Sequence, residues 1–200
     1  AVTLALPIEG WRTGEPASPA LRLAPGRAIA APPVRTWVDT DAACGAGPRV
    51  DPDDCLALLL LARSDSVRLV GVSTVFGNAP IETTDRTTRA LMSQLRDDSV
   101  QVYRGAGSAA PGLTMAARQL RAALAKEPLT IVALGPLTNV AAALRGRPDL
   151  QAKVVRLVAV MGRRQGHLFH PVEGGTANSF LGHGPVFRDF NFAQDEQAVE

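Results

Sequence analysis

The chain has 200 residues, of which 46% are hydrophobic and 20% charged, so most of it is expected to be globular rather than disordered. Its 21 basic and 19 acidic residues leave a formal charge of +2, a balance that does not indicate nucleic-acid binding. The longest apolar run, Leu56 to Ala62, is far shorter than a membrane-spanning helix. Two cysteines exclude a disulfide-rich scaffold and a four-cysteine zinc site. We therefore expect neither a nucleic acid nor a membrane as a partner.

The first 33 residues differ in composition from the rest of the chain. They hold six of the fifteen prolines and show no sustained apolar period. Such a composition is typical of an extended segment, and it lacks the basic start and long apolar stretch of a signal peptide. We expect residues 1–33 to form an irregular arm, and we expect a cytoplasmic location, with an exported form left open.

From Val34 onward, short β-branched runs alternate with longer amphipathic segments. The runs predict strands at Val34–Asp39, Val67–Val75, Val100–Arg104, Leu129–Leu134 and Val154–Met161. The segments between them predict helices at about Asp53–Ser64, Pro80–Leu95, Thr114–Ala125 and Leu137–Arg145. Strands and helices that alternate with short connections are typical of βαβ units. We therefore expect an α/β fold over residues 34–200, a doubly wound and mostly parallel Rossmann-like sheet with helices on both faces.

In a doubly wound sheet, ligands bind outside the carboxyl ends of the strands. The polar and glycine-rich segments of this chain follow those ends: Asp39-Thr40-Asp41, Phe76-Gly77-Asn78, Gly105, Gly135-Pro136-Leu137-Thr138-Asn139 and Met161-Gly162. The connections at the other edge have the composition of ordinary surface turns. The carboxyl edge is therefore where we expect the site.

An acidic cluster lies at the first of these strand ends. Five carboxylates fall within sixteen residues: Asp39, Asp41, Asp51, Asp53 and Asp54. Carboxylates held close together repel one another unless a cation lies between them or their pKa values rise. Oxygen ligands in this number favour calcium or magnesium over zinc. Alternatively, Asp51 or Asp53 caps the following helix and Asp54 complements its dipole, which leaves Asp39 and Asp41 unexplained. The cluster predicts a metal site.

An Asp-x-Asp segment after a strand also occurs in haloacid-dehalogenase-type phosphatases, which use the first Asp as a nucleophile beside magnesium. Their motif continues to Thr or Val where this chain has Ala43. Neither of the two lysines, Lys126 and Lys153, lies where their third motif needs one. A magnesium-dependent phosphatase is kept as an alternative.

Four segments of residues 34–200 resemble, in order, the motifs of the inosine–uridine-preferring nucleoside N-ribohydrolase family. Asp39-Thr40-Asp41 with Asp53-Asp54 resembles its DTDxGxDD opening, and Val70–Asn78 is similar to its second strand and GN turn. Ile131–Asn139 is close to its ALGPLTN segment, and Met161-Gly162 with Asp189-Phe190-Asn191 resembles its MGG…EFN pairing. The resemblance implies the nucleoside hydrolase fold.

The resemblance also implies a chemistry, the hydrolysis of the N-glycosidic bond of ribonucleosides to base and ribose with a bound Ca²⁺. By position, Asp41, Asp54 and the backbone carbonyl of Thr138 would be calcium ligands, and Asp53 would be the general base for a Ca²⁺-bound water. Substrate-binding roles would fall to four residues: Asn78, Asn191, His183, and Asp189 where the family has Glu. Carboxylates suit this reaction because its transition state resembles an oxocarbenium ion. A nucleoside is the expected partner, and a homo-oligomer is possible.

Several of these residues also have structural interpretations. Asn78 is alternatively a plain turn residue after Gly77, and Thr138 or Asn139 alternatively caps the helix after Pro136. Asn191 alternatively caps a helix near Ala193–Val199. His183 lies in a loop rich in glycine and histidine, where a surface position is the commoner outcome.

The chain departs from the family pattern in three places. Eleven residues, Ala42 to Pro52, separate Asp41 from the Asp pair, where the family has a much shorter spacer. Cys44 lies in this insertion and Cys55 just after it; oxidation would join the loop to the helix, but we expect two buried free thiols. The segment after Gly105 is short for the family's lid, so no base preference is indicated.

The third departure is length. The chain ends at Glu200, whereas the family's members are longer, so we expect the C-terminal part of the domain to be missing. That part would supply a further calcium-ligating Asp and a His near the leaving base. Without it, a non-catalytic ribose- or nucleoside-binding domain is the alternative to a hydrolase.

Overall fold

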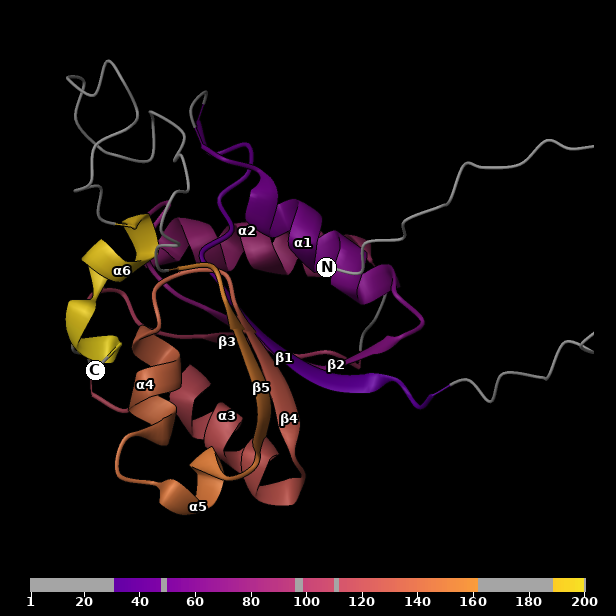
Figure 1. The fold of residues 1–200 in the computed structure, drawn as a ribbon. Coiled ribbons are helices and arrows are strands. Elements are labelled where there is room, and N and C mark those ends of the chain that lie inside the picture. The colour runs from indigo at the N-terminus through magenta and orange to yellow at the C-terminus, as the bar shows by residue number, and fades with distance from the viewer. Residues whose placement is uncertain (1–30, 48–49, 96–98, 110–111, 162–188, 200) are drawn as a thin grey trace, which may run out of the picture. The chain divides into compact units, whose positions relative to one another are not determined.

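The computed structural model describes residues 31–47, 50–95, 99–109, 112–161 and 189–199 (Figure 1). Within these residues, five strands form one sheet in the order β3-β2-β1-β4-β5, and every pairing is parallel. The strands are β1 (Val34–Thr40), β2 (Val67–Thr74), β3 (Val102–Arg104), β4 (Leu129–Ala133) and β5 (Val154–Ala159). The predicted α/β fold with a parallel sheet is thus confirmed. The arm expected for residues 1–33 lies almost wholly outside the described residues.

Helices connect the strands, as the alternating pattern predicts. They are α1 (Asp53–Arg63), α2 (Ile81–Gln94), α3 (Met115–Lys126), α4 (Thr138–Leu144) and α5 (Pro148–Gln151), followed later by α6 (Phe190–Gln194) and the 3₁₀ turn η1 (Glu196–Ala198). β2 lies on one side of β1 and β4 on the other, so the winding direction of the sheet reverses at β1. In open α/β sheets, the crevice at such a reversal is where ligands bind.

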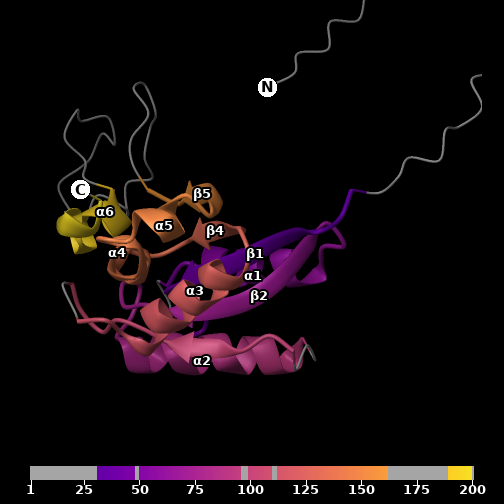
Figure 2. The ribbon, with the colours of Figure 1, turned by 90° about the horizontal axis from the view of Figure 1, so that it is seen from below.

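The two faces of the sheet have separate cores because successive side chains of a strand point in opposite directions. On one face, Trp37 packs in a cluster with residues of α3, α4 and α5, among them Leu120 and Leu150. On the other face, Val38 packs in a cluster with Leu58 of α1 and Met92 of α2. Figure 1 shows the resulting layers, with α1 and α2 on one side of the sheet and α3 to α5 on the other, and Figure 2 gives the view from the side of α3 to α5.

Helix α3 illustrates how local sequence sets these layers. Thr114 is its N-cap, and the Thr114 hydroxyl accepts a hydrogen bond from the backbone N–H of Ala117 at 3.1 Å. The buried residues Ala116, Leu120 and Leu124 are spaced by four, which places them on one side of the helix. This apolar side covers the sheet, and the cap fixes where the helix begins.

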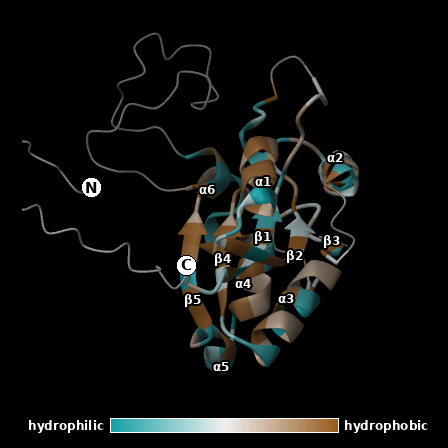
Figure 3. Ribbon diagram, turned by 90° about the vertical axis from the view of Figure 1, so that its right-hand side faces the viewer, coloured by the Kyte–Doolittle hydropathy of each residue, from teal (hydrophilic) through white to brown (hydrophobic). Residues whose placement is uncertain are grey.

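Strand β5 forms one edge of the sheet and carries exposed apolar side chains. Val155 is 70% exposed, and Leu157 and Val158 are also exposed. Figure 3 shows the apolar character of this strand in brown. No helix within the described parts of the chain combines the length and apolarity needed to cross a membrane.

Candidate active site

Three segments meet at the carboxyl edge of the sheet around the carboxyl group of Asp41. A Cβ atom added to Gly77 would lie 2.0 Å from Oδ2 of Asp41, and one added to Gly135 would lie 2.9 Å from its Cγ. Gly77 also has a φ of +151°, which side-chain-bearing residues rarely adopt. The turns after β2 and β4 therefore need glycine here because Asp41 occupies the space that a side chain would take.

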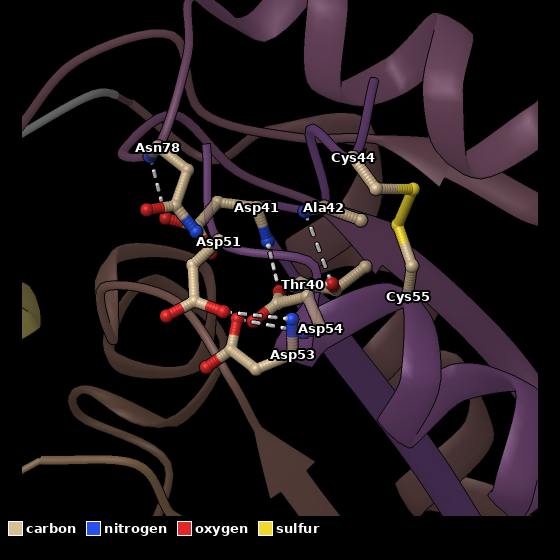
Figure 4. Close-up of a disulfide and its surroundings, with 9 residues drawn as sticks. All are labelled: Thr40, Asp41, Ala42, Cys44, Asp51, Asp53, Asp54, Cys55 and Asn78. Carbon is tan, nitrogen blue, oxygen red and sulfur yellow. Dashed lines mark hydrogen bonds between the residues drawn. A yellow bond between two sulfur atoms is a disulfide. The ribbon is translucent and has the colours of Figure 1, made fainter. Parts of the chain in front are cut away.

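Asn78 binds this carboxyl group directly. Its backbone N–H donates to Oδ2 of Asp41 at 2.8 Å, and its side-chain amide donates to Oδ1 at 3.3 Å (Figure 4). Asn78 is therefore more than a turn residue, since it orients Asp41 through two hydrogen bonds. Its place beside a candidate metal ligand agrees with a position in the site.

Asp54 brings the first turn of α1 to the end of β1. The hydroxyl of Thr40 and the backbone N–H of Asp41 both donate to Oδ2 of Asp54, the latter at 3.0 Å. Asp54 is only 4% exposed and Asp41 is fully buried. The structure thus brings together, as the sequence predicted, two carboxylates that are separated by the eleven-residue loop (Figure 4).

The electrostatics of this acidic pair, Asp41 and Asp54, favour a bound cation. Burial and, as the next largest cause, the charge of Asp54 together raise the pKa of Asp41 to about 9. Burial likewise raises the pKa of Asp54. Two buried carboxyl groups that lie this close hold a proton between them unless a cation replaces it. The carboxylate oxygens are hard donors of the kind that calcium and magnesium prefer.

The acidic pair by itself does not complete the coordination of such a cation, so other oxygen atoms would have to supply further ligands. Within the described ranges, no group of three or more such side chains is placed to hold a metal ion. Calcium commonly takes backbone carbonyl and water oxygens besides carboxylates. The acidic pair therefore fits a hard cation as a partial ligand set.

Asp53 lies beside the pair but faces solvent. It is exposed at the start of α1, and its Oδ1 accepts a hydrogen bond from the backbone N–H of Asp54 at 2.8 Å. Asp51 accepts from the backbone N–H of Asp53 at 3.2 Å, but the N-cap of α1 is Pro52, so the interpretation of Asp51 or Asp53 as the cap of this helix is wrong. Asp53 is the carboxylate of this cluster that is both next to the buried pair and open to water.

Asp39 serves a buried network that the sequence did not reveal. Its Oδ1 accepts hydrogen bonds from the Ser73 hydroxyl and, at 2.9 Å, from the Asn139 amide, while its buried Oδ2 has no hydrogen-bond partner among the described residues. Burial raises the pKa of Asp39 to about 7. Trp37 donates to the Ser73 hydroxyl at 2.8 Å and thereby extends the network into the core.

Asn139 connects three strand ends and does not cap α4, whose N-cap is Leu137. Besides Asp39, its amide nitrogen donates to the carbonyl of Thr74 at 2.9 Å. Its carbonyl oxygen accepts from the backbone N–H of Ala106 at 3.0 Å and from the Thr114 hydroxyl at 3.2 Å. These partners are 25 to 100 positions away in the chain, so no local pattern could identify them.

Thr138 is buried at the start of α4, and its hydroxyl donates to Oδ2 of Asp195 at 2.6 Å. This contact brings the segment after α6 to the end of β4. Asp195 was not predicted as a site residue, and nothing in its local sequence distinguishes it. The interpretation of Thr138 as a helix cap is wrong, because the hydroxyl is used in a tertiary contact.

The predicted helix near Ala193–Val199 is replaced by α6 and η1, which begin and end elsewhere. Asp189 caps α6 by accepting a hydrogen bond from the backbone N–H of Phe192 at 2.9 Å. Asn191 therefore does not cap a helix. Its amide nitrogen donates to the carbonyls of Leu134 and Val160, both at 2.7 Å, and so joins α6 to the ends of β4 and β5. His183 lies outside the described residues.

The expectation of two free thiols is wrong, because Cys44 and Cys55 form a disulfide (Figure 4). The loop after β1 folds back onto the first turn of α1, and this leaves the two Cα atoms 6.3 Å apart. That distance lies within the range that a disulfide spans. The insertion loop is therefore fastened to α1 next to Asp54.

The family model described as inosine-uridine preferring nucleoside hydrolase matches residues 36–200. The chain is 29% identical over 179 residues to the pyrimidine-specific ribonucleoside hydrolase RihA of Klebsiella pneumoniae (strain 342), covering 74% of this chain and 52% of that protein. The corresponding protein of Escherichia coli (strain SMS-3-5 / SECEC) is 28% identical over 177 residues at the same coverages. The chain thus spans about half the length of the curated relatives it matches.

Solved structures have a similar fold. A plant nucleoside hydrolase, the PpNRh1 enzyme, aligns with a TM-score of 0.66 at 23% identity, covering 84% of this chain and 56% of that one. The inosine-uridine preferring nucleoside hydrolase from Bacillus anthracis aligns with a TM-score of 0.63 at 21% identity, covering 83% of this chain and 60% of that one. These similarities confirm the predicted fold.

Proposed function

Because the chain belongs to the inosine-uridine preferring nucleoside hydrolase family, we propose that it hydrolyses the N-glycosidic bond of ribonucleosides to free base and ribose. The observation that supports this most directly is the acidic pair, with Asp41 oriented by Asn78 and enclosed by Gly77 and Gly135. Carboxylates there would face a sugar whose anomeric carbon becomes positively charged as the bond breaks.

In this proposal, Ca²⁺ is the cofactor, held by Asp41, Asp54 and the backbone carbonyl of Thr138. The raised pKa values of the two carboxyl groups support it, because a pair that retains a proton when metal-free gains most from exchanging that proton for a cation. When bound, Ca²⁺ supplies a positive charge that attracts hydroxyl oxygens and makes a water easier to deprotonate.

Asp53 would act as the general base. Its exposed carboxylate lies next to Asp54 in sequence and is hydrogen-bonded to the Asp54 backbone, so it is oriented toward the same edge while remaining accessible to water. A base positioned in this way accepts a proton from the attacking water and typically contributes about 10²–10⁴-fold to the rate.

The ribose would be bound by polar side chains around the acidic pair. Asn78 has an amide that both donates and accepts, which suits a hydroxyl group. Asp189 is the N-cap of α6, Asn191 lies on α6 and bonds the end of β4, and the bond from Thr138 to Asp195 holds this segment near the edge. His183 completes the proposed substrate-binding residues.

The disulfide bears on the location of the protein. The cytoplasmic location expected from the sequence stays a prediction, and the Cys44–Cys55 disulfide favours the exported alternative, because disulfides persist in oxidising compartments. A homo-oligomer stays a prediction as well.

The test is an assay of base release from inosine and uridine in the presence of Ca²⁺, with products separated by chromatography. The Asp53→Asn variant is expected to lose about 10²-fold or more of the rate while keeping its fold and its Ca²⁺ affinity. Asp65→Asn, at an exposed turn on the other edge of the sheet, is the matched control and should behave as wild type. Full activity of Asp53→Asn would remove Asp53 as the base.

The same assay separates the alternatives. A nucleoside that binds, as measured by calorimetry, without release of base would identify a non-catalytic binding domain. Phosphate released from a phosphomonoester with Mg²⁺ would identify the phosphatase. Absence of both nucleoside binding and base release would contradict the proposal.

A further inference from the structure

The Cys44–Cys55 disulfide lies at the acidic pair. Cys44 follows Asp41 by three residues, and Cys55 follows Asp54 directly, so the bridge joins the two segments that carry the pair (Figure 4). Cys55 is buried with Asp54, whereas Cys44 is partly exposed beside the exposed residue Gly45. The bridge therefore has a buried end at the site and an end near solvent.

The position of Asp54 depends on contacts made across the loop that this bridge closes. Oδ2 of Asp54 accepts from the Thr40 hydroxyl and from the backbone N–H of Asp41, and both donors belong to the β1 side of the loop. Pro52 occupies the N-cap of α1 and provides no side-chain cap. The start of α1 is thus attached to the end of β1 by the Asp54 carboxyl group and, one residue later, to the loop after β1 by the disulfide.

The loop between Asp41 and α1 is long and rich in small residues. Ala42 to Pro52 includes Gly45 and Gly47, and residues 45–47 are exposed. The backbone bonds from Ala46 N–H to the Ala43 carbonyl at 2.9 Å and from Val50 N–H to the Gly47 carbonyl at 3.5 Å are local to the loop. These two bonds lie within the loop, whereas its last residues, Asp51 and Pro52, accept hydrogen bonds from backbone N–H groups of α1. The Cys44 side of the loop is joined to α1 by the disulfide.

We propose that Cys44 and Cys55 are positioning residues whose disulfide holds Asp54 against Asp41, so that reduction of the disulfide lowers the affinity of the acidic pair for Ca²⁺. The cation in this statement rests on the proposed function, whereas the positioning of Asp54 does not. A disulfide in this role makes cation binding at the site depend on whether the surroundings reduce or oxidise thiols.

The reducing step uses a dithiol. Its thiolate attacks one sulfur of the bridge and releases the other cysteine as a thiolate, which takes up a proton. The second thiol of the dithiol then attacks the mixed disulfide, which frees the second cysteine. The dithiol ends as a cyclic disulfide, and the protein gains two thiols.

The test follows the amide proton of Asp41, because that N–H donates to Asp54 and reports the pairing without any metal. Hydrogen exchange is measured on the folded protein with and without dithiothreitol, with the amide of Ile131 in buried β4 as the internal control. On reduction, exchange at Asp41 should become at least about tenfold faster while Ile131 stays unchanged. Ca²⁺ titration by calorimetry should show an affinity lowered by roughly 10- to 100-fold, the effect typical of losing a partner that orients a ligand.

The double variant Cys44→Ser/Cys55→Ser should resemble the reduced protein and no longer respond to dithiothreitol. Since both cysteines of the chain form this bridge, the reductant has no other disulfide to reduce in it. Unchanged exchange at Asp41 after complete reduction would overturn the proposal, as would equal acceleration at Asp41 and Ile131, which would mark the bridge as a general stabiliser. If the oxidised protein binds no Ca²⁺, the metal assignment fails, and the exchange data still decide whether the bridge positions Asp54.

Discussion

The side-chain amide of Asn139 donates to Oδ1 of Asp39 at 2.9 Å and so joins two residues that are 100 positions apart in the chain. The bond crosses from the first turn of α4 to the end of β1, where the winding of the sheet reverses. Because the same amide also binds the Thr74 carbonyl, one side chain links the ends of β1 and β2 to the α4 turn. Buried hydrogen bonds of Asn139 therefore connect the strand ends at the edge of the sheet that carries the acidic pair.

Asn139→Ala should destabilise the fold. The substitution leaves the Thr74 carbonyl and the Ala106 N–H buried without this partner, and each unpaired buried group costs about 1–3 kcal/mol. Urea denaturation measures the loss of unfolding free energy. Gln151→Ala removes an amide that bonds a carbonyl at an exposed position and should cost less than about 1 kcal/mol. Equal losses of unfolding free energy in the two variants would show that the buried hydrogen bonds of Asn139 contribute no more to stability than the exposed one of Gln151.

The metal-free protein should become less stable as the pH rises from 5 to 9. The folded-state pKa values of Asp39 and Asp41 are raised, mainly by burial, to about 7 and about 9, from 3.8 for a free aspartate side chain in water. The folded state thus keeps protons that the unfolded chain has already released, and this contribution, full below pH 4, is lost as the pH passes 7 and then 9.

Thermal melts in a chelator at pH 5, 7 and 9 measure this dependence. The melting temperature should fall across the series, and Asp41→Asn should show a smaller fall because it removes one of the titrating groups. A melting temperature that rises from pH 5 to pH 9 in the wild-type protein would contradict the assigned direction.

Gly77→Ala should displace the carboxyl group of Asp41. The added Cβ would lie 2.0 Å from Oδ2, so the hydrogen bond from the Asn78 N–H could not persist, and the φ of +151° adds backbone strain. We expect the free energy of unfolding to fall by about 2 kcal/mol or more, because the backbone strain and the broken hydrogen bond both destabilise the folded state. Gly146→Ala is the matched control, because its φ of +69° is also positive but nothing lies within 4 Å of the added atom. In that control, the free energy of unfolding should fall by about 1 kcal/mol.

Two leucines of α1 offer a test of the core. Leu58 is fully buried against the sheet, whereas Leu60 is 71% exposed on the same helix. Leu58→Ala should lower the unfolding free energy by about 2–5 kcal/mol because it leaves a cavity, and Leu60→Ala should change it by less than about 0.5 kcal/mol. Denaturant melts of both variants measure the difference. Similar effects at the two positions would mean that α1 does not pack as described.

Much of the fold was predictable because it depends on short-range patterns. The apolar run of β1 and the Leu-rich start of α1 follow from periodicity and turn residues, and the observed bounds differ from the predicted ones by only a few residues. The C-terminal segment was less predictable: α6 is short, and its start depends on the Asp189 cap, so its local pattern is weak.

The candidate site, too, was predictable from the sequence only in part. That Asp41, Asp54 and Asn78 meet at one edge follows from sequence, since parallel strands end together. The distant partners of Asn139, the contact of Thr138 with Asp195, and the Cys44–Cys55 bridge do not.

By itself, the sequence determined the alternation of strands and helices, the edge where the polar residues gather, and the family to which the motifs point. Only the tertiary structure decided which carboxylates are buried together, and whether two cysteines eleven positions apart in the chain meet. The physical reason is that periodicity and turn residues act over a few neighbouring positions. The burial of Asp39 and Asp41 and the closing of the Cys44–Cys55 loop depend instead on how segments far apart in the chain pack.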